Sequence, residues 1–298
     1  MTEFRNNSPS VSVILPNYNY GHYFVSRLKE ILAQTYQVSE VIVLDDASTD
    51  KSASIIKKEL KNQEKLHPKL KFVLSQNSAN SGNVFSQWQK GVELATSEYI
   101  WIAELDDSCE PTFLETVMKP IIKHKKVVLS YTNSKLIGDV TRRDLWRQKL
   151  DFFRRHHLPG KYVISGKREL NKNLAIFNSI PNVSAVVFKN IPELKRILDG
   201  AKKYSLCGDW YFYSKLAEQG KIAYNPKKLN SHRLSSESVT SQTDLEKRFK
   251  EIKRVHSEID LANKLSALAL MRMEKSERKL DKVWKIAKIR QYDENMVK

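Results

Sequence analysis

Short apolar runs alternate with amphipathic stretches along the first hundred residues of the chain. Four runs have the length of a buried strand, and they cover residues 11–15, 41–44, 70–74 and 99–103. Between these runs, apolar residues recur three or four positions apart, which predicts helices over residues 25–34, around 55–60 and over 85–95. This alternation predicts an α/β domain with a mostly parallel central sheet flanked by helices.

Polar loops follow three of the predicted strands, at Asn17–Asn19, Asp45–Asp50 and Glu104–Asp107. Ligands of open α/β sheets bind outside the carboxyl ends of the strands, so we expect the three loops to face one crevice. The three carboxylates of the last loop repel one another unless a cation or hydrogen-bond donors compensate them. Mg²⁺ and Mn²⁺ prefer such oxygens, whereas a solvated acidic turn is the alternative on spacing alone. Ser48 and Asp50 are candidate caps for the helix that follows.

The pattern is looser after residue 110. Further strands are predicted at residues 127–131 and 184–188, and a helix at residues 206–218. From Leu245 onward neither proline nor glycine interrupts the chain, which predicts one or two long amphipathic helices. Near their end, Trp284 lies among lysines and an arginine. This arrangement favours an interfacial helix on anionic lipid, a helix packed on the domain or a contact between two copies.

Charge is distributed unevenly within a net balance of +17. Residues 119–172 contain 15 Lys and Arg against 4 Asp and Glu, whereas residues 1–118 contain 11 against 15. The basic segment indicates an anionic partner, such as a lipid phosphate, an acidic glycan or a nucleic acid. A lysine-rich solvated surface is the alternative.

Other classes of protein are disfavoured by the composition. No run approaches the ~20 apolar residues that span a bilayer, and residues 1–10 lack the apolar segment of a signal peptide. We therefore expect a cytoplasmic location, with peripheral contact at the inner face of a membrane as a further expectation. Cys109 and Cys207 provide neither a disulfide framework nor a zinc pattern, so reduced structural cysteines are expected.

The motifs at the strand ends resemble those of family 2 glycosyltransferases in order and spacing. Three of them, Pro16–Asn19, Asp45–Asp50 and Trp101–Asp107, carry the resemblance, and weaker matches follow at Asn182–Ala185, Gly208–Trp210 and Ser238–Thr240. Each motif alone is common, but the ordered set is specific.

The resemblance implies a Rossmann-like GT-A fold and an inverting, metal-dependent transferase of the bacterial surface-glycan type. Residues 1–115 would form the nucleotide-sugar-binding half of the GT-A domain, and residues 116–244 the half that binds the acceptor and carries the catalytic base. Residues 245–298 are expected, from their own hydrophobic pattern, to form a basic amphipathic helical extension, and a homo-oligomer through these helices is one of the alternatives given above. The donor would be a UDP-, dTDP- or GDP-linked sugar, and the acceptor a hydroxyl of a glycan or lipid-linked molecule.

The resemblance also assigns roles to single residues. Asp209 would be the catalytic base, although Gly208 stands where relatives usually have Glu. The metal, Mn²⁺ or Mg²⁺, would be held by Asp107, Asp106 and His232, while Glu104 replaces a usual Asp. The nucleotide sugar would contact Tyr18 on the base, Asp46 on the edge of the base, and also Pro16, Asn19, Asn80, Asp106 and Arg233.

Each assignment has a plain structural alternative. Tyr18 would then fill the sheet edge, Asp46 and Asn80 would serve turns, Asp209 would cap a helix, and His232 would be a surface residue. Three other functions each fit part of the sequence. A nucleotidyltransferase needs a Gly-rich basic loop after the first strand, where this chain has residues 17–22, NYNYGH. A nucleic-acid-binding protein fits the charge but not the acidic strand ends, and no nucleic-acid partner is expected. Many relatives have a histidine at the position of Ser235, where the nearest histidine of this chain is His232. A non-catalytic, glycosyltransferase-like binding protein is consistent with the departures at Gly208 and Ser235.

Overall fold

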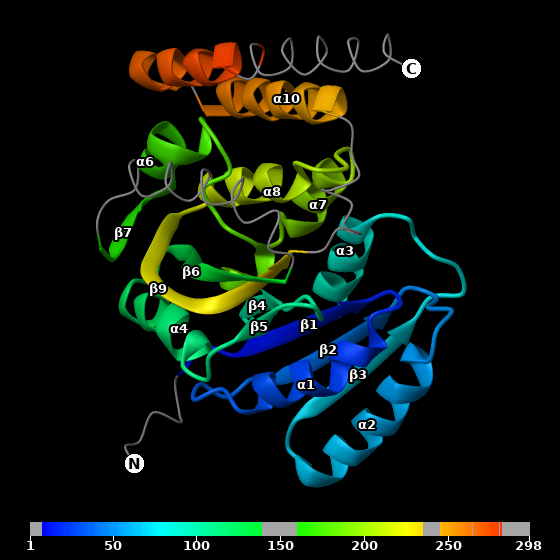
Figure 1. Ribbon diagram of the computed structural model, residues 1–298. Coiled ribbons are helices and arrows are strands. Elements are labelled where there is room, and N and C mark those ends of the chain that lie inside the picture. Colours follow the sequence, from blue (N-terminus) through cyan, green and yellow to red (C-terminus); the bar gives the residue numbers. More distant parts are fainter. Residues whose placement is uncertain (1–7, 139–159, 235–244, 264, 280, 282–298) are drawn as a thin grey trace, which may run out of the picture.

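A nine-stranded mixed sheet forms the centre of the molecule (Figure 1). The computed structural model describes residues 8–138, 160–234, 245–263, 265–279 and 281. The strands follow the order β3-β2-β1-β4-β8-β6-β9-β5, and β7 pairs with β9 off this path. Their bounds are β1 Val11–Asn17, β2 Glu40–Asp45, β3 Lys71–Gln76, β4 Tyr99–Ile102, β5 Ser108–Cys109, β6 Val127–Gly138, β7 Tyr162–Ser165, β8 Val186–Lys189 and β9 Lys221–Leu234.

The first four strands are parallel to one another, as the alternating pattern predicts. Every residue of β1 and β2 is buried, since helices cover both faces of the sheet there, and their sequences therefore read as continuous apolar runs. The second half of the sheet differs from the expectation of a mostly parallel sheet. There β8 runs antiparallel to β4 and β6, and β5 and β7 run antiparallel to β9.

Two hydrophobic layers cover the two faces of the sheet. One contains apolar residues of α1, α2 and α4, and the other contains apolar residues of α3, α7, α8 and α10. Helices such as α1, α2 and α4 bury one stripe of their surface, as expected for amphipathic helices that pack on a sheet, whereas α8 is buried on nearly all sides. The bounds are α1 Gly21–Leu32, α2 Ser52–Leu66, α3 Val84–Leu94, α4 Phe113–Lys123, α6 Gly166–Glu169, α7 Leu194–Ala201, α8 Gly208–Ala217 and α10 Leu245–Asn263.

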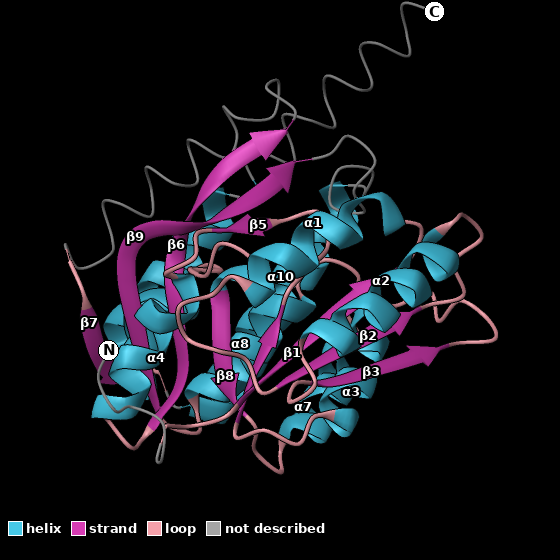
Figure 2. Ribbon diagram, turned by 90° about the horizontal axis from the view of Figure 1, so that it is seen from below, coloured by secondary structure: helices cyan, strands magenta, loops and turns pink. Residues whose placement is uncertain are grey.

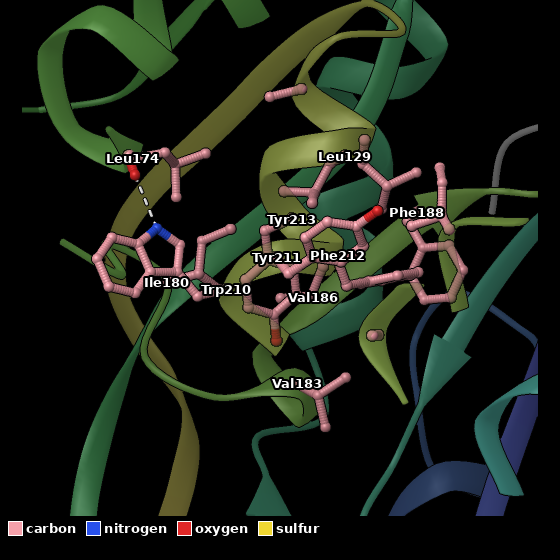
Figure 3. Packing of buried hydrophobic residues seen from close by; sticks show 14 of the residues in the cluster. Leu129, Leu174, Ile180, Val183, Val186, Phe188, Trp210, Tyr211, Phe212 and Tyr213 are labelled. Atoms are coloured by element: carbon pink, nitrogen blue, oxygen red, sulfur yellow. Dashed lines mark hydrogen bonds between the residues drawn. The ribbon is translucent and has the colours of Figure 1, made fainter. Parts of the chain in front are cut away.

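The centre of the second layer is α8. Phe212 packs edge to face on Phe188, and the indole N–H of Trp210 donates to the carbonyl of Leu174 at 2.7 Å (Figure 3). Trp210 is only 4% exposed, so its N–H needs this internal acceptor. The residue before Trp210 is the predicted base, Asp209, which is thus anchored to the core.

Long paired strands extend from the sheet on one side. In Figure 2, β6 and β9 run side by side beyond the other strands, and their parallel pairing continues to Gly138 and Leu234. The two-residue strand β5 pairs Ser108 with Ser231. This pairing brings the end of β9 next to the acidic loop that follows β4.

Some predicted bounds differ from the structure. The run at residues 184–188 begins as a 3-10 turn, η2 Val183–Ala185, before β8. The helix predicted from residue 25 begins at Gly21. The weak match at residues 238–240, the departure at Ser235 and the Trp284 segment lie outside the described residues. In the part of the chain that the structure describes, no helix is long and apolar enough to cross a membrane.

Candidate active site

The loops after β1 and β2 are joined by buried side chains. The Asn17 amide donates to Asp45 Oδ1 at 2.8 Å and to Ser48 Oγ at 2.9 Å. Ser48 in turn donates to Asp45 and accepts from the backbone N–H of Asn19. Ser48 therefore links the two loops, whereas Asp50, which precedes the N-cap residue Lys51, accepts from the first N–H of α2.

Two residues of these loops adopt left-handed backbone conformations, Asn19 at φ 60° and Ala47 at φ 59°. Asparagine tolerates this region, but a residue such as alanine is strained there, and strain of this kind concentrates at functional sites. The Asn19 side chain accepts from the N–H groups of Thr49 and Asp50. In the structure, then, Asn19 fixes the shape of the loop after β2.

One carboxylate oxygen of Asp46 accepts its full number of hydrogen bonds. Its Oδ1 accepts from the side chains of Asn77 and Gln87 and from the N–H of Ser81, and its Oδ2 accepts from the Ser81 hydroxyl, over 2.6–2.9 Å. A carboxylate offers about four acceptor positions, two on each oxygen, so Oδ2 retains capacity for a further donor. The structure thus gives Asp46 an internal anchoring role, and its contact with a base stays a prediction.

The other residues that are predicted to contact the nucleotide sugar lie in or near these loops. Pro16 is buried in β1 opposite Leu44, whereas Tyr18 is 43% exposed beyond the strand end. An exposed aromatic ring at this position is accessible to a planar ligand. Asn80 accepts from the N–H of Gly82 and thus serves a turn, as its structural alternative predicted.

Asp107 is the most buried acid of the cluster, with 6% of its surface exposed. Its Oδ2 accepts from the Asn182 amide at 2.7 Å, and its Oδ1 accepts from the backbone N–H of Arg233 at 3.0 Å. His232 Nδ1 lies 3.4 Å from the same Oδ1. The pairing of β5 with β9 therefore places His232 and Arg233, 125 or more positions later in the sequence, directly at Asp107.

The Arg233 side chain is held on the other side of the acidic loop. Its Nε donates to the carbonyl of Asp106 at 2.8 Å, and its guanidinium lies 5.1 Å from the ring centre of Tyr23. Arg233 therefore places a positive charge at the acid cluster, and its contact with the nucleotide sugar stays a prediction.

The three acids of the cluster differ in their pKa values. Burial and the charge of Asp106 raise the pKa of Glu104 to about 8, although the Trp88 indole N–H donates to it at 3.1 Å. Burial and the charge of Asp107 raise the pKa of Asp106 to about 6. Burial also raises the pKa of Asp107, but hydrogen bonding and the charge of His232 outweigh this effect and lower it. A cation would relieve this crowding of acids.

A divalent ion fits this donor set only in part. In the described portion of the chain, no group of three or more His, Cys, Asp and Glu side chains is placed to hold an ion. However, Mg²⁺ is commonly bound by one or two carboxylates together with substrate phosphates and water. Asp107 with Asp106 or His232 fits such a shared site, which the nucleotide would complete.

Asp209 occupies the first turn of α8. Its Oδ2 accepts from the Asn178 amide at 2.9 Å, and its Oδ1 accepts from the N–H of Trp210 at 2.7 Å. The structure also accounts for the neighbouring Gly208. A Cβ there would lie 2.4 Å from the Phe85 ring and 2.7 Å from the carbonyl of Ala201, so the usual Glu has no room.

One short segment contacts both proposed functional acids. Asn178 donates to Asp209, and Asn182 donates to Asp107. Since these asparagines are four residues apart, their Cα atoms are separated by at most about 14 Å. One segment of five residues therefore contacts both the predicted base and the predicted metal acid.

Sequence reasoning missed several residues of this site. Neither Asn178 nor the Asp46 partners Ser81 and Gln87 were assigned roles, and Asn182 was noted only as part of a weak motif. Their signal is faint because amide and hydroxyl residues occur in most loops. An asparagine four residues before another, ahead of an apolar run, is a hint only once the acids are known.

Comparison with known proteins identifies the family. The sequence model named Glycosyl transferase family 2 matches residues 12–176, more than half of the chain. An uncharacterized glycosyltransferase of Haemophilus influenzae is 23% identical across 93% of this chain and 85% of that protein. Three other curated glycosyltransferases match this chain over only 30–36% of their own length.

Solved structures share the fold. TarS of S. aureus, in a complex with UDP-GlcNAc, superimposes with a TM-score of 0.64 at 18% identity, over 90% of this chain and 71% of that one. The mannosyltransferase PcManGT of Pyrobaculum calidifontis, in complex with GDP-Man and Mn²⁺, gives 0.57 at 18% identity, over 91% and 74%. The predicted GT-A architecture is thus confirmed, and the chain belongs to family 2 of the glycosyl transferases.

Proposed function

We propose that this protein is an inverting glycosyltransferase that moves a sugar from a nucleoside diphosphate to an acceptor hydroxyl. The observation that carries the proposal is the segment 178–182, which contacts Asp209 at one end and Asp107 at the other. One acid can serve the leaving diphosphate while the other serves the acceptor.

The donor side of the proposal rests on the loops after β1, β2 and β4. Tyr18 offers an exposed ring for the base, and Asp46 Oδ2 keeps capacity for an N–H of a uracil, thymine or guanine. Arg233 adds a positive charge beside Asp106. The similarity to proteins in complex with UDP-GlcNAc and GDP-Man supports a nucleotide-sugar donor of this class.

Asp107, Asp106 and His232 would hold the divalent ion. When bound, Mn²⁺ or Mg²⁺ would neutralise charge on the departing diphosphate, and the fold neighbour in complex with Mn²⁺ supports its use. The backbone N–H of Arg233 and the Asn182 amide orient Asp107 without removing its charge.

Asp209 would remove the proton of the acceptor hydroxyl as this oxygen attacks the anomeric carbon. A positioned carboxylate contributes about 10²–10⁴-fold to such a step. Attack opposite the leaving group inverts the anomeric configuration. Asn178 would fix the direction of the base, because its amide occupies one side of Asp209 Oδ2.

The acceptor would be a glycan or lipid-linked molecule of a bacterial surface polysaccharide. The surplus of Lys and Arg over residues 119–172 supports an anionic acceptor, such as a lipid-linked diphosphate. Residues 1–115 and 116–244 would then be the donor and acceptor halves of one domain.

A screen of nucleotide sugars for transfer or hydrolysis tests this function. We expect one UDP-, GDP- or dTDP-linked sugar to be consumed in the presence of Mn²⁺, and consumption to stop when EDTA is added. If no nucleotide sugar is consumed while a nucleotide still binds, the non-catalytic binding protein would be the better description.

Peripheral contact with a membrane is tested by flotation with vesicles that contain anionic lipid. We expect the full chain to float and a chain ending at residue 278 to float less, because the Lys-rich segment around Trp284 is removed. Equal flotation of both chains would exclude this segment as the anchor.

A further inference from the structure

A carboxylate from the C-terminal part of the chain binds the turn that leads into α8. Glu251, in α10, accepts from three consecutive backbone N–H groups, those of Ser205 at 2.8 Å, Leu206 at 2.8 Å and Cys207 at 3.0 Å. Glu251 is 9% exposed, and these contacts join residues 44–46 positions apart. Asp209 follows two residues after the last of them.

This contact supplies what the start of α8 lacks locally. The N-terminal end of a helix carries a partial positive charge that favours an anion, and the three N–H groups bound by Glu251 belong to the N-cap residue Cys207 and the two residues before it. Cys207 stands at the N-cap position and, in the part of the chain that the structure describes, makes no side-chain cap. Hydrogen bonds from N–H groups to a carboxylate are among the stronger ones, so Glu251 fixes this turn from a distance.

A second contact from α10 reaches the other flank of Asp209. The His256 ring packs edge to face on Trp210 with 5.2 Å between ring centres, and its Nε2 lies 3.3 Å from the carbonyl of Ile176. Trp210 follows Asp209 directly, and Ile176 precedes Asn178, the amide donor to Asp209, by two residues. His256 is fully buried, so this contact is part of the core.

We propose that α10 is a positioning element for the base, with Glu251 as its main positioning residue. This inference rests on the proposed role of Asp209. Glu251 fixes the turn before Asp209, and His256 fixes the residue after it and the loop that carries Asn178. Loss of Glu251 displaces the base relative to the acceptor and leaves the loops that bind the donor in place.

The experiment compares Glu251→Ala and Glu251→Gln with the wild-type protein. Glu274→Gln is the matched control, since Glu274 is 64% exposed and pairs only with Arg278 among the described contacts. With the nucleotide sugar found by the screen, we expect kcat of Glu251→Ala to fall about 10- to 100-fold, which is typical of small misplacements of reacting groups. The kcat of Glu251→Gln should fall less than that of Glu251→Ala, because the amide oxygen of Gln can still accept a hydrogen bond.

Two further measurements separate positioning from a general loss of structure. The Kd for UDP, GDP or dTDP with Mn²⁺ and the KM for the donor should stay within about twofold of wild type. Amide hydrogen exchange should accelerate at Ser205, Leu206 and Cys207 in Glu251→Ala. In the wild-type protein these three amides should be protected, which tests the contact even if the alanine variant does not fold.

An unchanged kcat for Glu251→Ala, or a parallel loss of kcat and nucleotide binding, would overturn the inference. Fast exchange of the three amides in the wild-type protein would do the same. Failure of the proposed function gives a different result, because the wild-type protein would then consume no nucleotide sugar, and failure of the base assignment alone would leave Asp209→Asn with full transfer. Unchanged Glu251→Ala beside an inactive Asp209→Asn would leave the function standing and reject the positioning role alone.

Discussion

Two asparagines orient the two acids on which the proposed chemistry depends. Each donates an amide N–H to one carboxylate oxygen, Asn182 to Asp107 and Asn178 to Asp209. An amide donor fixes the direction of a carboxylate and leaves its negative charge available. The two carboxylates are therefore held in fixed directions before any ligand arrives.

Replacement of Asp209 by Asn should remove transfer and spare donor binding. The amide has nearly the same shape but takes no proton from the acceptor, so we expect the rate to fall by about 10²–10⁴-fold. Transfer is followed with the donor from the nucleotide-sugar screen, and nucleotide binding by calorimetry. Asp199→Asn is the control, because Asp199 is 55% exposed and pairs with Lys202 at the surface. Full transfer by Asp209→Asn would show that another group is the base.

Gly208 is required by the packing of α3 against α8. Because an added Cβ would lie 2.4 Å from the Phe85 ring, Gly208→Ala should destabilise the protein by about 1–3 kcal/mol. The free energy of unfolding is measured with urea for both single variants, Gly208→Ala and Phe85→Leu, and for the double variant. Since the two positions are in contact, we expect the double variant to lose less stability than the sum of the single variants. Strictly additive losses would contradict the proposed clash.

At the scale of elements, the C-terminal helices are part of the core. Val255, Ile259 and Met273 join the same hydrophobic cluster as α8, and His256 Nδ1 lies 2.7 Å from Glu277 Oε1 in the next helix, residues 267–279. Figure 1 shows α10 lying over α8 and the next helix, in red, beside α10. The described part of the predicted extension is therefore packed on the domain, whereas the segment around Trp284, for which the three alternatives were given, lies outside the described residues.

The buried His256 should make stability depend on pH. Burial lowers the pKa of His256 below its ordinary 6.5, although Glu277 and the Ile176 carbonyl oppose this effect. Below about pH 6.5, His256 is protonated in the unfolded chain but stays neutral in the folded protein. The free energy of unfolding therefore falls as the pH drops.

Melting temperatures between about pH 7.5 and about pH 5.5 test this dependence. The decrease should be smaller in His256→Gln than in the wild-type protein, while His67→Gln, at an exposed position, should behave like wild type. An equal pH dependence in His256→Gln and wild type would contradict the account.

The order of elements in the first half could be predicted because each has a local signal. Residues 41–44 are apolar on both faces and are followed by Asp45 and Asp46, so both the strand and its position at the crevice could be inferred. The second half could not be predicted as well, since β5 has two residues and forms only by pairing with β9. Glu251 lay beyond prediction for the same reason. Its three partners are 44–46 residues away, and a contact over this distance leaves no pattern of apolar and polar positions in the sequence.

At the scale of the whole molecule, two halves of one sheet contribute different chemistry. The parallel half brings the ends of β1, β2 and β4 to one edge, and the mixed half brings the end of β9 and the segment 178–182 to the same acids. The site is assembled from segments more than 200 residues apart in the sequence. Its function therefore depends on the intact fold.

The melting temperature of the protein with UDP, GDP and dTDP, each with Mn²⁺ or with EDTA, tests the central claim most directly. At a nucleotide concentration about 100 times Kd, binding adds about 2.7 kcal/mol, which corresponds to a rise of roughly 5 °C for a protein of this size. We expect one nucleotide to give this rise with Mn²⁺, and the rise to shrink with EDTA and in Asp107→Asn. No rise with any of the three nucleotides would contradict a nucleotide-sugar site at this crevice.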